Sequence, residues 1–147
     1  MEHKVMVYTD GGSRGNPGPS AIGILIYTQD GKLLNNHREY IGITTNNQAE
    51  YAAVLKALEM AASFTRSEVC CHSDSKLMAS QLSGIFKVKN SGLQEAFSKV
   101  KQAEKAFAAV AYVHLPRTDS RIRLADNLVN RALDEERRQD SVLPPGR

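Results

Sequence analysis

Tryptophan is absent from this sequence of 147 residues, which also has only five tyrosines, four phenylalanines and two cysteines. No apolar run approaches the roughly twenty residues that a membrane-spanning helix needs, and the first residues show no charged-then-apolar signal pattern. Cys70 and Cys71 are adjacent, so in a strand they would point to opposite faces and make poor disulfide partners. We therefore expect reduced cysteines, a cytoplasmic location and no membrane contact.

A large excess of one charge is lacking as well. The formal net charge is +3 and the pI is about 8.9, which permits an anionic partner but is less basic than most nucleic-acid-binding domains. An apolar share of 41% and a charged share of 24% are ordinary for a globular protein. The length suits one domain, which we place at residues 1–138 of a monomer, followed by a flexible tail at residues 139–147.

The hydrophobic pattern alternates between two periods along the chain. It predicts strands at about Lys4–Asp10, Ala21–Tyr27, Leu33–Ile41, Glu68–His72 and Ala109–Leu115. It predicts helices at about Gln48–Ser63, Lys76–Leu82, Ser91–Phe107 and Leu124–Arg137, and a loop at GGSRGNPGP. Three successive strands favour an antiparallel meander, and later strands alternating with helices favour parallel crossovers. The order predicts an α/β fold with a mixed five-stranded sheet, three strands antiparallel and two parallel, flanked by helices.

Four carboxylates stand at the ends of these elements. Asp10 and Asp74 stand at the carboxyl ends of the first and fourth strands, and Glu50 and Asp126 are expected in the first turns of two helices. Each alone is most often a turn or helix-cap residue. If the first and fourth strands are parallel neighbours, however, Asp10 and Asp74 meet at the edge of the sheet where ligands bind in open α/β folds. Gathered carboxylates repel one another, so the pattern predicts a divalent metal site that also receives a phosphate.

Four segments of the chain resemble the signature blocks of type 1 ribonuclease H, in family order and at family spacing. They are TDGGSRGNPGPSAIG (Thr9–Gly23), TTNNQAEYAAVLKAL (Thr44–Leu58), HSDSKL (His72–Leu77) and LADNLVNRAL (Leu124–Leu133). The first two blocks are specific, whereas the last two would be weak alone. The likeness extends from about Lys4 to Leu133 and is closest to the compact bacterial and archaeal branch, because a Trp-rich basic insertion is missing.

The resemblance implies a ribonuclease H-like fold and an endonuclease that cuts the RNA strand of an RNA–DNA hybrid, leaving a 5′-phosphate and a 3′-hydroxyl. It implies two divalent ions, Mg²⁺ or Mn²⁺, which together activate a water and stabilise the leaving oxygen. The family's four metal-binding acidic positions correspond here to Asp10, Glu50, Asp74 and Asp126.

The resemblance also implies contacts to the hybrid. It assigns them to Gly11, Gly12, Asn16, Thr45, Asn46, Asn47, Ser75 and Lys76. Short amides suit recognition of the 2′-hydroxyl that distinguishes RNA from DNA, and Thr45 would hold a phosphate of the DNA strand. The two asparagines also suit the start of a helix, so we weigh capping and reading equally. Arg14 could meet a phosphate or simply lie in solvent, and Lys76 replaces the glutamine often found there.

The segment His114–Arg123 is where the sequence departs from the family. Many relatives have a histidine or an arginine here that assists metal or product exchange, and we assign this role to Arg117, since His114 stands at a predicted strand end. Several relatives keep a polar or acidic residue four positions before the last aspartate. Ile122 occupies that position, a change that bears on turnover and metal preference.

Three alternatives stay open. The chain could be a related nuclease of the same fold with broader substrates, a catalytically inactive hybrid-binding module, or a domain that works inside a longer polypeptide such as a reverse transcriptase. Competition between hybrid and plain DNA as substrates distinguishes the broader nuclease from a ribonuclease H. Metal-dependent cleavage, with Asp10→Asn as control, distinguishes an enzyme from the inactive binding module. The third is disfavoured by the limits of the chain, which surround one domain.

Overall fold

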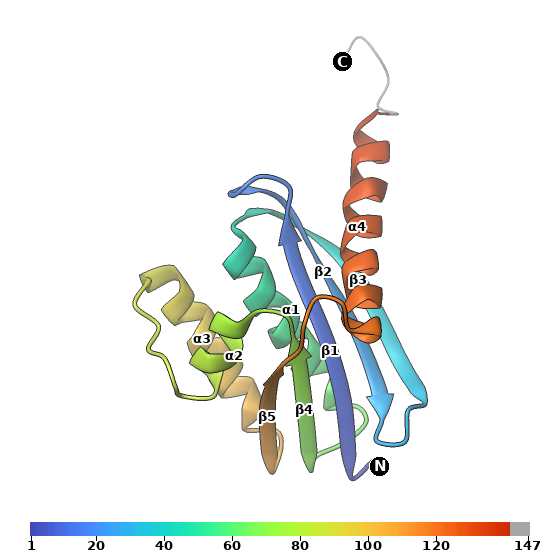
Figure 1. The fold of residues 1–147 in the computed structure, drawn as a ribbon, viewed down its shortest axis with the longest axis vertical. Helices are drawn as coiled ribbons and strands as arrows, with labels where there is room; N and C mark the ends of the chain where they lie inside the picture. Colours follow the sequence, from blue (N-terminus) through green and yellow to red (C-terminus); the bar gives the residue numbers. More distant parts are fainter. Residues whose placement is uncertain (142–147) are drawn as a thin grey trace.

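Five strands form one mixed sheet in the computed structural model, which describes residues 1–141 (Figure 1). Their bounds are Lys4–Ser13 (β1), Gly18–Thr28 (β2), Leu33–Thr44 (β3), Glu68–Ser73 (β4) and Ala109–His114 (β5). The spatial order is β3-β2-β1-β4-β5, with β3, β2 and β1 antiparallel and with β4 parallel to both β1 and β5. The predicted fold class, with three antiparallel and two parallel strands, is confirmed.

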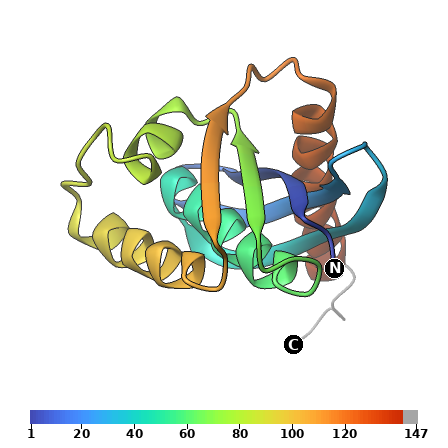
Figure 2. The ribbon, with the colours of Figure 1, turned by 90° about the horizontal axis from the view of Figure 1, so that it is seen from below.

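Helices cover both faces of this sheet (Figure 2). Within the described residues they are Asn46–Ala61 (α1), Lys76–Leu82 (α2), Ser91–Glu104 (α3) and Ser120–Ser141 (α4). The alternation of side chains along β1 separates the two faces. Val5 and Val7 belong to the core beneath α1 and α3, whereas Tyr8 packs with Ile122 and Ala125 of α4.

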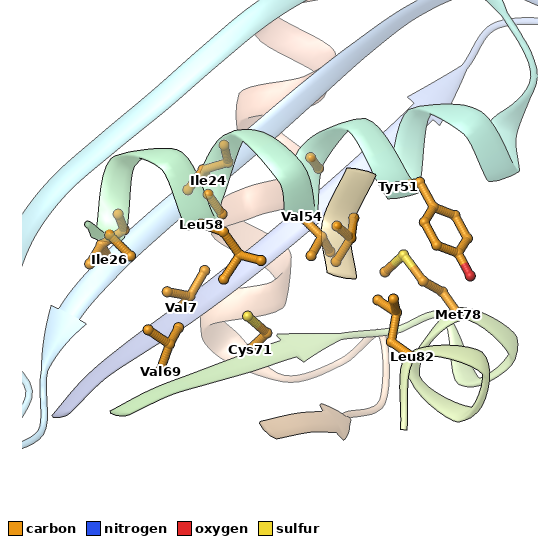
Figure 3. Close-up of a cluster of buried hydrophobic side chains, with 14 of the residues drawn as sticks. Val7, Ile24, Ile26, Tyr51, Val54, Leu58, Val69, Cys71, Met78 and Leu82 are labelled. Atoms are coloured by element: carbon orange, nitrogen blue, oxygen red, sulfur yellow. The ribbon is translucent and has the colours of Figure 1, made fainter. Parts of the chain in front are cut away.

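The larger core lies between α1 and the sheet (Figure 3). Val54 and Leu58 of α1 are one turn apart and at most 1% exposed, and they face Val7, Ile24 and Val69 of the strands. Burying each such side chain contributes about 1.5–3 kcal/mol. This packing holds α1 at a fixed height above β1, which matters for the acidic residue that α1 carries.

The prediction of a loop directly after Asp10 is wrong. Strand β1 continues through Gly11, Gly12 and Ser13, which pair in register with Ile22, Ala21 and Ser20 of β2. Two adjacent glycines favour a turn locally, but the ladder of hydrogen bonds to a long, buried partner strand outweighs that preference. Asp10 therefore lies within a strand instead of at its end.

Two helices also begin earlier than predicted. The hydroxyl of Thr45 accepts a hydrogen bond from Gln48 N at 3.2 Å and caps α1. A carboxylate oxygen of Asp119 accepts from Arg121 N at 3.0 Å and Ile122 N at 3.1 Å, the geometry of a cap on α4. The predicted first-turn positions of Glu50 and Asp126 are thus wrong, since both lie in the second turn of their helices.

Helix α4 also runs further than predicted, to Ser141. The tail predicted from residue 139 therefore begins within this helix, and residues 142–147 lie outside the described part of the chain. Among the helices of the described part, none has both the length and the apolarity required to cross a membrane.

Candidate active site

Three of the predicted carboxylates converge. Asp10 from β1, Glu50 from α1 and Asp74, directly after β4, each offer an oxygen, and these oxygens all lie within 4.8 Å of one another. The parallel pairing of β1 with β4 ends at Tyr8 and His72, and Asp10 and Asp74 each stand two residues further on. The shared register of the two strands therefore sets their two carboxylates side by side, at the edge where ligands of α/β sheets bind.

Glu50 joins this pair because α1 lies unusually close to β1. A Cβ atom on Gly11 would stand 2.3 Å from the carbonyl carbon and oxygen of Ala49 and 2.5 Å from the nitrogen of Glu50. Such distances between non-bonded atoms are not tolerated, so only glycine permits this approach. Gly11 is consequently buried within a strand, and its predicted position in a loop is wrong.

Asp126 reaches the same cleft from the opposite face of the sheet. Gly23, the partner of Asp10 in the β1–β2 ladder, makes this possible, because a Cβ there would stand 2.3 Å from the carbonyl oxygen of Ala125. Asp126 is exposed and lies outside the group of three, but its carboxylate contacts that of Asp10. In both cases, a glycine of the sheet allows a helix to approach closely at the alanine that directly precedes its acidic residue.

The electrostatics of the cluster favour a bound cation. Burial, followed by repulsion from Asp74 and Asp126, raises the pKa of Asp10 to about 8. Burial likewise raises the pKa of Glu50 to about 7, although a hydrogen bond from Ser75 and the charge of Arg117 act in the opposite direction. Near neutral pH both groups would take up protons unless a positive charge replaced them. An all-carboxylate donor set of this kind suits a hard divalent cation, so the residues present fit a metal ion.

The segment after β5 brings Arg117, but not His114, to the cleft. Arg117 Nε lies 3.7 Å from Asp74 Oδ2, with a side chain that is 89% exposed. His114 ends β5 and does not line the cleft. Ile122 is fully buried among Tyr8, Leu25 and other residues between α4 and the sheet. Its side chain therefore faces the core, and a polar group at this position would not point at the carboxylates.

The predicted asparagines form a network beside the cluster. Asn46 N donates to Asn16 Oδ1 at 3.0 Å, and Ser13 N donates to Asn46 Oδ1 at 2.9 Å. These bonds tie the end of β1 and the β1–β2 loop to the first residue of α1. Thr45, and neither Asn46 nor Asn47, is the residue that caps this helix, so the expected capping role of the asparagines is wrong. Asn16, Asn46 and Asn47 are all exposed.

Ser75 and Lys76 lie at the start of α2. The Ser75 hydroxyl accepts from Met78 N at 3.1 Å as the cap of α2, and it also hydrogen bonds to Glu50. This hydroxyl is therefore engaged within the protein, where it orients an acidic residue of the cluster. Lys76 is exposed, and Gly12 packs against α4, where an added Cβ would meet Val129 Cγ1 at 3.3 Å.

The carboxylates line an open cleft of about 330 Å³. Its lining includes Arg14, for which the sequence left a phosphate contact or a position in solvent open, and four residues that the sequence did not point to, namely Ser13, Val129, Asn130 and Leu133. The last three were detectable, because they follow Asp126 at helical spacing and so share its face of α4. The sequence placed Asp126 in the first turn of its helix, and the residues on the same helix face in the following turns were not considered.

Residues 2–132 match the sequence profile of a family described as RNase H. The chain belongs to the ribonuclease H family. A Ribonuclease HI of Halobacterium salinarum is 38% identical over 133 residues, 90% of this chain and 65% of that protein. The crystal structure of RNase H1 from this archaeon matches with a TM-score of 0.85 at 37% identity, covering 90% of this chain and 98% of that one.

Two further ribonuclease H relatives show the same likeness. LC11-RNase H1, crystallised in complex with an RNA/DNA hybrid, matches with a TM-score of 0.84 at 40% identity, covering 90% of this chain and 98% of that chain. A bifunctional protein of Mycobacterium tuberculosis is 37% identical over 132 residues, 89% of this chain. This chain spans 36% of the mycobacterial protein and 65% of the archaeal one, so it corresponds to a part of each.

Proposed function

We propose that this protein is a metal-dependent endonuclease that hydrolyses the RNA strand of RNA–DNA hybrids and leaves 5′-phosphate and 3′-hydroxyl ends. The observation that carries the proposal is the convergence of Asp10, Glu50 and Asp74 within 4.8 Å in an open cleft, with Asp126 facing Asp10. The relative LC11-RNase H1, with an RNA/DNA hybrid bound, supports the choice of substrate.

The four carboxylates would hold two divalent ions, Mg²⁺ or Mn²⁺. Bound ions of this kind supply Lewis acidity at both the entering and the departing oxygen of the phosphodiester. Asp10 would serve both ions, because it adjoins Asp74 on one side and Asp126 on the other. The hydrogen bond from Ser75 orients the Glu50 carboxylate and acts against the rise in its pKa.

Arg117 has a separate task in this proposal. Its exposed guanidinium lies beside Asp74 at 3.7 Å, a distance too long for a tight pair. Such a group can turn from the carboxylate to a phosphate oxygen, which suits a role in releasing the product or exchanging an ion.

Selection of RNA would rest on the asparagines beside the cluster. The side-chain oxygens of Asn16 and Asn46 accept backbone hydrogen bonds, so their amide nitrogens are the atoms left to contact a ligand. Amide N–H groups can donate to the 2′-hydroxyl oxygen and to minor-groove acceptors of a hybrid. Asn47 adds an exposed amide next to them. We assign the remaining contacts to the backbone of Gly11 and Gly12, and to Thr45, Ser75 and Lys76.

A cleavage assay on four end-labelled substrates tests this function. Hybrid, duplex RNA, duplex DNA and single-stranded RNA are each incubated with Mg²⁺ and with Mn²⁺, with Asp10→Asn as the inactive control. We expect the hybrid to be cut fastest, at least about 100-fold faster than DNA, and the variant to lose about 10³-fold or more. Equal rates on hybrid and DNA would contradict the 2′-hydroxyl argument. Tight binding without cleavage would instead identify a hybrid-binding module.

The proposal also includes a monomer acting in the cytoplasm. Cys70 and Cys71 are both free and buried, which suits a reducing compartment. Analytical ultracentrifugation at micromolar concentration tests the monomer.

A further inference from the structure

Arg14 lies in the short loop between β1 and β2 and lines the cleft that holds the carboxylates. Its Nη2 stands 2.7 Å from Asp134 Oδ1, and 3.5 Å from both the carbonyl oxygen and the side-chain oxygen of Asn130. These contacts hold the guanidinium over one end of the cleft, against the face of α4 that also carries Asp126. The proposed function leaves this arginine without a role.

A nucleic acid is a polyanion, but the cleft carries four carboxylates and few positive charges. Among the described residues that line it, Arg14 and Arg117 are the cations. Arg117 adjoins Asp74 in the carboxylate cluster. Arg14 pairs with Asp134, which follows Asp126 by eight residues and therefore stands ~12 Å further along α4. The phosphates of one strand follow each other every few ångströms, so a strand cut at the cluster would have further phosphates at this distance.

We propose that Arg14 binds a backbone phosphate of the hybrid, a few nucleotides from the bond that is cut. The proposal rests on the proposed function, because it requires a nucleic acid in the cleft. A guanidinium can engage two phosphate oxygens at once. Asp134 orients Arg14 in the free protein, and the phosphate replaces Asp134 as the partner of Arg14 when the hybrid binds.

Exchange of this partner requires little free energy. The side chains of Arg14 and Asp134 are 40% and 53% exposed, and pairs so accessible to solvent contribute little to stability. A backbone phosphate, like a carboxylate, offers the guanidinium two oxygens that share one negative charge, but it arrives with the rest of the hybrid already held at the cluster. Asp134 is therefore a competitor of the substrate for Arg14.

The chain provides a matched control one residue further along α4. Arg38 Nε of β3 pairs with Glu135 Oε1 at 2.5 Å, and the two side chains are 34% and 41% exposed. This pair also joins α4 to the sheet, but Arg38 and Glu135 line a different groove, between β3 and α4. Breaking the Arg38 pair therefore shows how much KM changes when α4 loses an ion pair to the sheet while the cleft is unaltered.

Steady-state cleavage of the hybrid by three variants tests the proposal. For Arg14→Gln we expect KM to rise about 5- to 20-fold with kcat within about twofold, and the slope of log KM against log salt to become shallower by about one. Arg38→Gln should keep the wild-type KM and slope. Asp134→Asn should lower KM about two- to threefold, because it removes the competitor. Far-ultraviolet circular dichroism and the melting temperature verify that all three variants fold.

Two results would overturn the proposal. One is an Arg14→Gln variant with the KM and salt slope of the wild type. The other is an equal rise of KM in Arg14→Gln and Asp134→Asn, since a pair that merely fastens the loop to α4 is broken equally from either side.

Binding measurements separate this inference from the proposed function. Each substitution is repeated in the Asp10→Asn background, and the affinity for a fluorescent hybrid is measured in Mg²⁺ by anisotropy. If the wild type cuts no hybrid, the proposed function fails, and a 5- to 20-fold loss of affinity on Arg14→Gln still supports the phosphate contact, whereas no loss overturns it. Hybrids with single neutral methylphosphonate linkages in the RNA or the DNA strand locate the phosphate. When the neutral linkage replaces the phosphate that Arg14 contacts, the proteins with and without Arg14→Gln should bind the hybrid with equal affinity.

Discussion

At the scale of single residues, the site depends as much on glycine as on carboxylate. Gly11 and Gly23 stand where a Cβ would lie 2.3 Å from the backbone of Ala49 and Ala125, the residues directly before Glu50 and Asp126. The absence of two side chains from the sheet lets two helices approach it, one from each face. A larger residue at either position would push a helix, and its acidic side chain, out of reach of Asp10.

Replacing Gly11 by alanine should therefore destabilise the protein much more than the same change at its neighbour. We expect Gly11→Ala to lower the free energy of unfolding by about 3 kcal/mol, because a Cβ would press on helix backbone that cannot yield locally. Gly12→Ala should lower it by less than about 1 kcal/mol, since the atom it would meet is a side-chain methyl of Val129 at 3.3 Å. Urea denaturation in EDTA measures both, and equal losses would contradict the close-approach argument.

At the scale of elements, the caps decide which helical turn carries each acidic residue. Thr45 starts α1 at Asn46, and Asp119 caps α4, which starts at Ser120, so Glu50 and Asp126 stand in second turns, facing the sheet edge. Helix α2 is held at its other end, where Lys101 Nζ of α3 donates to the carbonyl oxygen of Leu82 at 2.6 Å. Each helix that carries part of the site is thus fixed by a short polar contact as well as by its apolar face.

The cap of α4 can be tested against the cap of α3. Asn90 Oδ1 accepts from Leu93 N at 3.1 Å, as Asp119 does on α4, but α3 carries none of the four carboxylates. We expect Asp119→Ala and Asn90→Ala each to lower the free energy of unfolding by about 1 kcal/mol. Only Asp119→Ala should also raise the Mg²⁺ concentration for half-maximal cleavage, by about three- to tenfold, because Asp126 lies in the turn that follows the loosened first turn of α4. Equal metal requirements in the two variants would show that the cap does not position Asp126.

At the scale of the whole molecule, four ligand candidates come from four different elements. Holding them together without a cation is unfavourable, because burial and then mutual repulsion raise the pKa of Asp10 to about 8 and that of Glu50 to about 7, against ordinary values of 3.8 and 4.5. A carboxyl group whose pKa is higher in the folded state stabilises the fold while it is protonated. That contribution is complete below the ordinary pKa and is lost as the pH rises through the folded value.

Stability should consequently depend on pH and on metal together. In EDTA, we expect the melting temperature to fall between pH 6.5 and 8.5, a range chosen above the lowered pKa of the buried His72, whose protonation would act in the opposite direction. Saturating Mg²⁺ should raise the melting temperature, and more at pH 8.5 than at 6.5, because the cation binds the deprotonated carboxylates. Asp10→Asn should reduce both effects. A wild type whose melting temperature in EDTA is unchanged or higher at pH 8.5 would contradict the raised pKa values of the two carboxyl groups.

The chain's local patterns already contain the order of the elements, the mixed sheet and the identity of the acidic residues. Period-two and helical spacing are local properties, and the blocks around Asp10, Glu50, Asp74 and Asp126 have their family spacing. These were sufficient for the fold class, which the structure confirms.

Contacts between distant segments were decided only by the tertiary structure. The Gly11–Gly12 pair looks like a turn until β2 is paired with it, and Gly23 looks like an ordinary strand residue until Ala125 is packed on it. Arg14 looks like a solvent-exposed loop residue until α4 places Asp134 beside it. Close approach and charge pairing depend on what lies across space, and residues that are more than a hundred positions apart in the chain become neighbours only when the sheet and its helices pack.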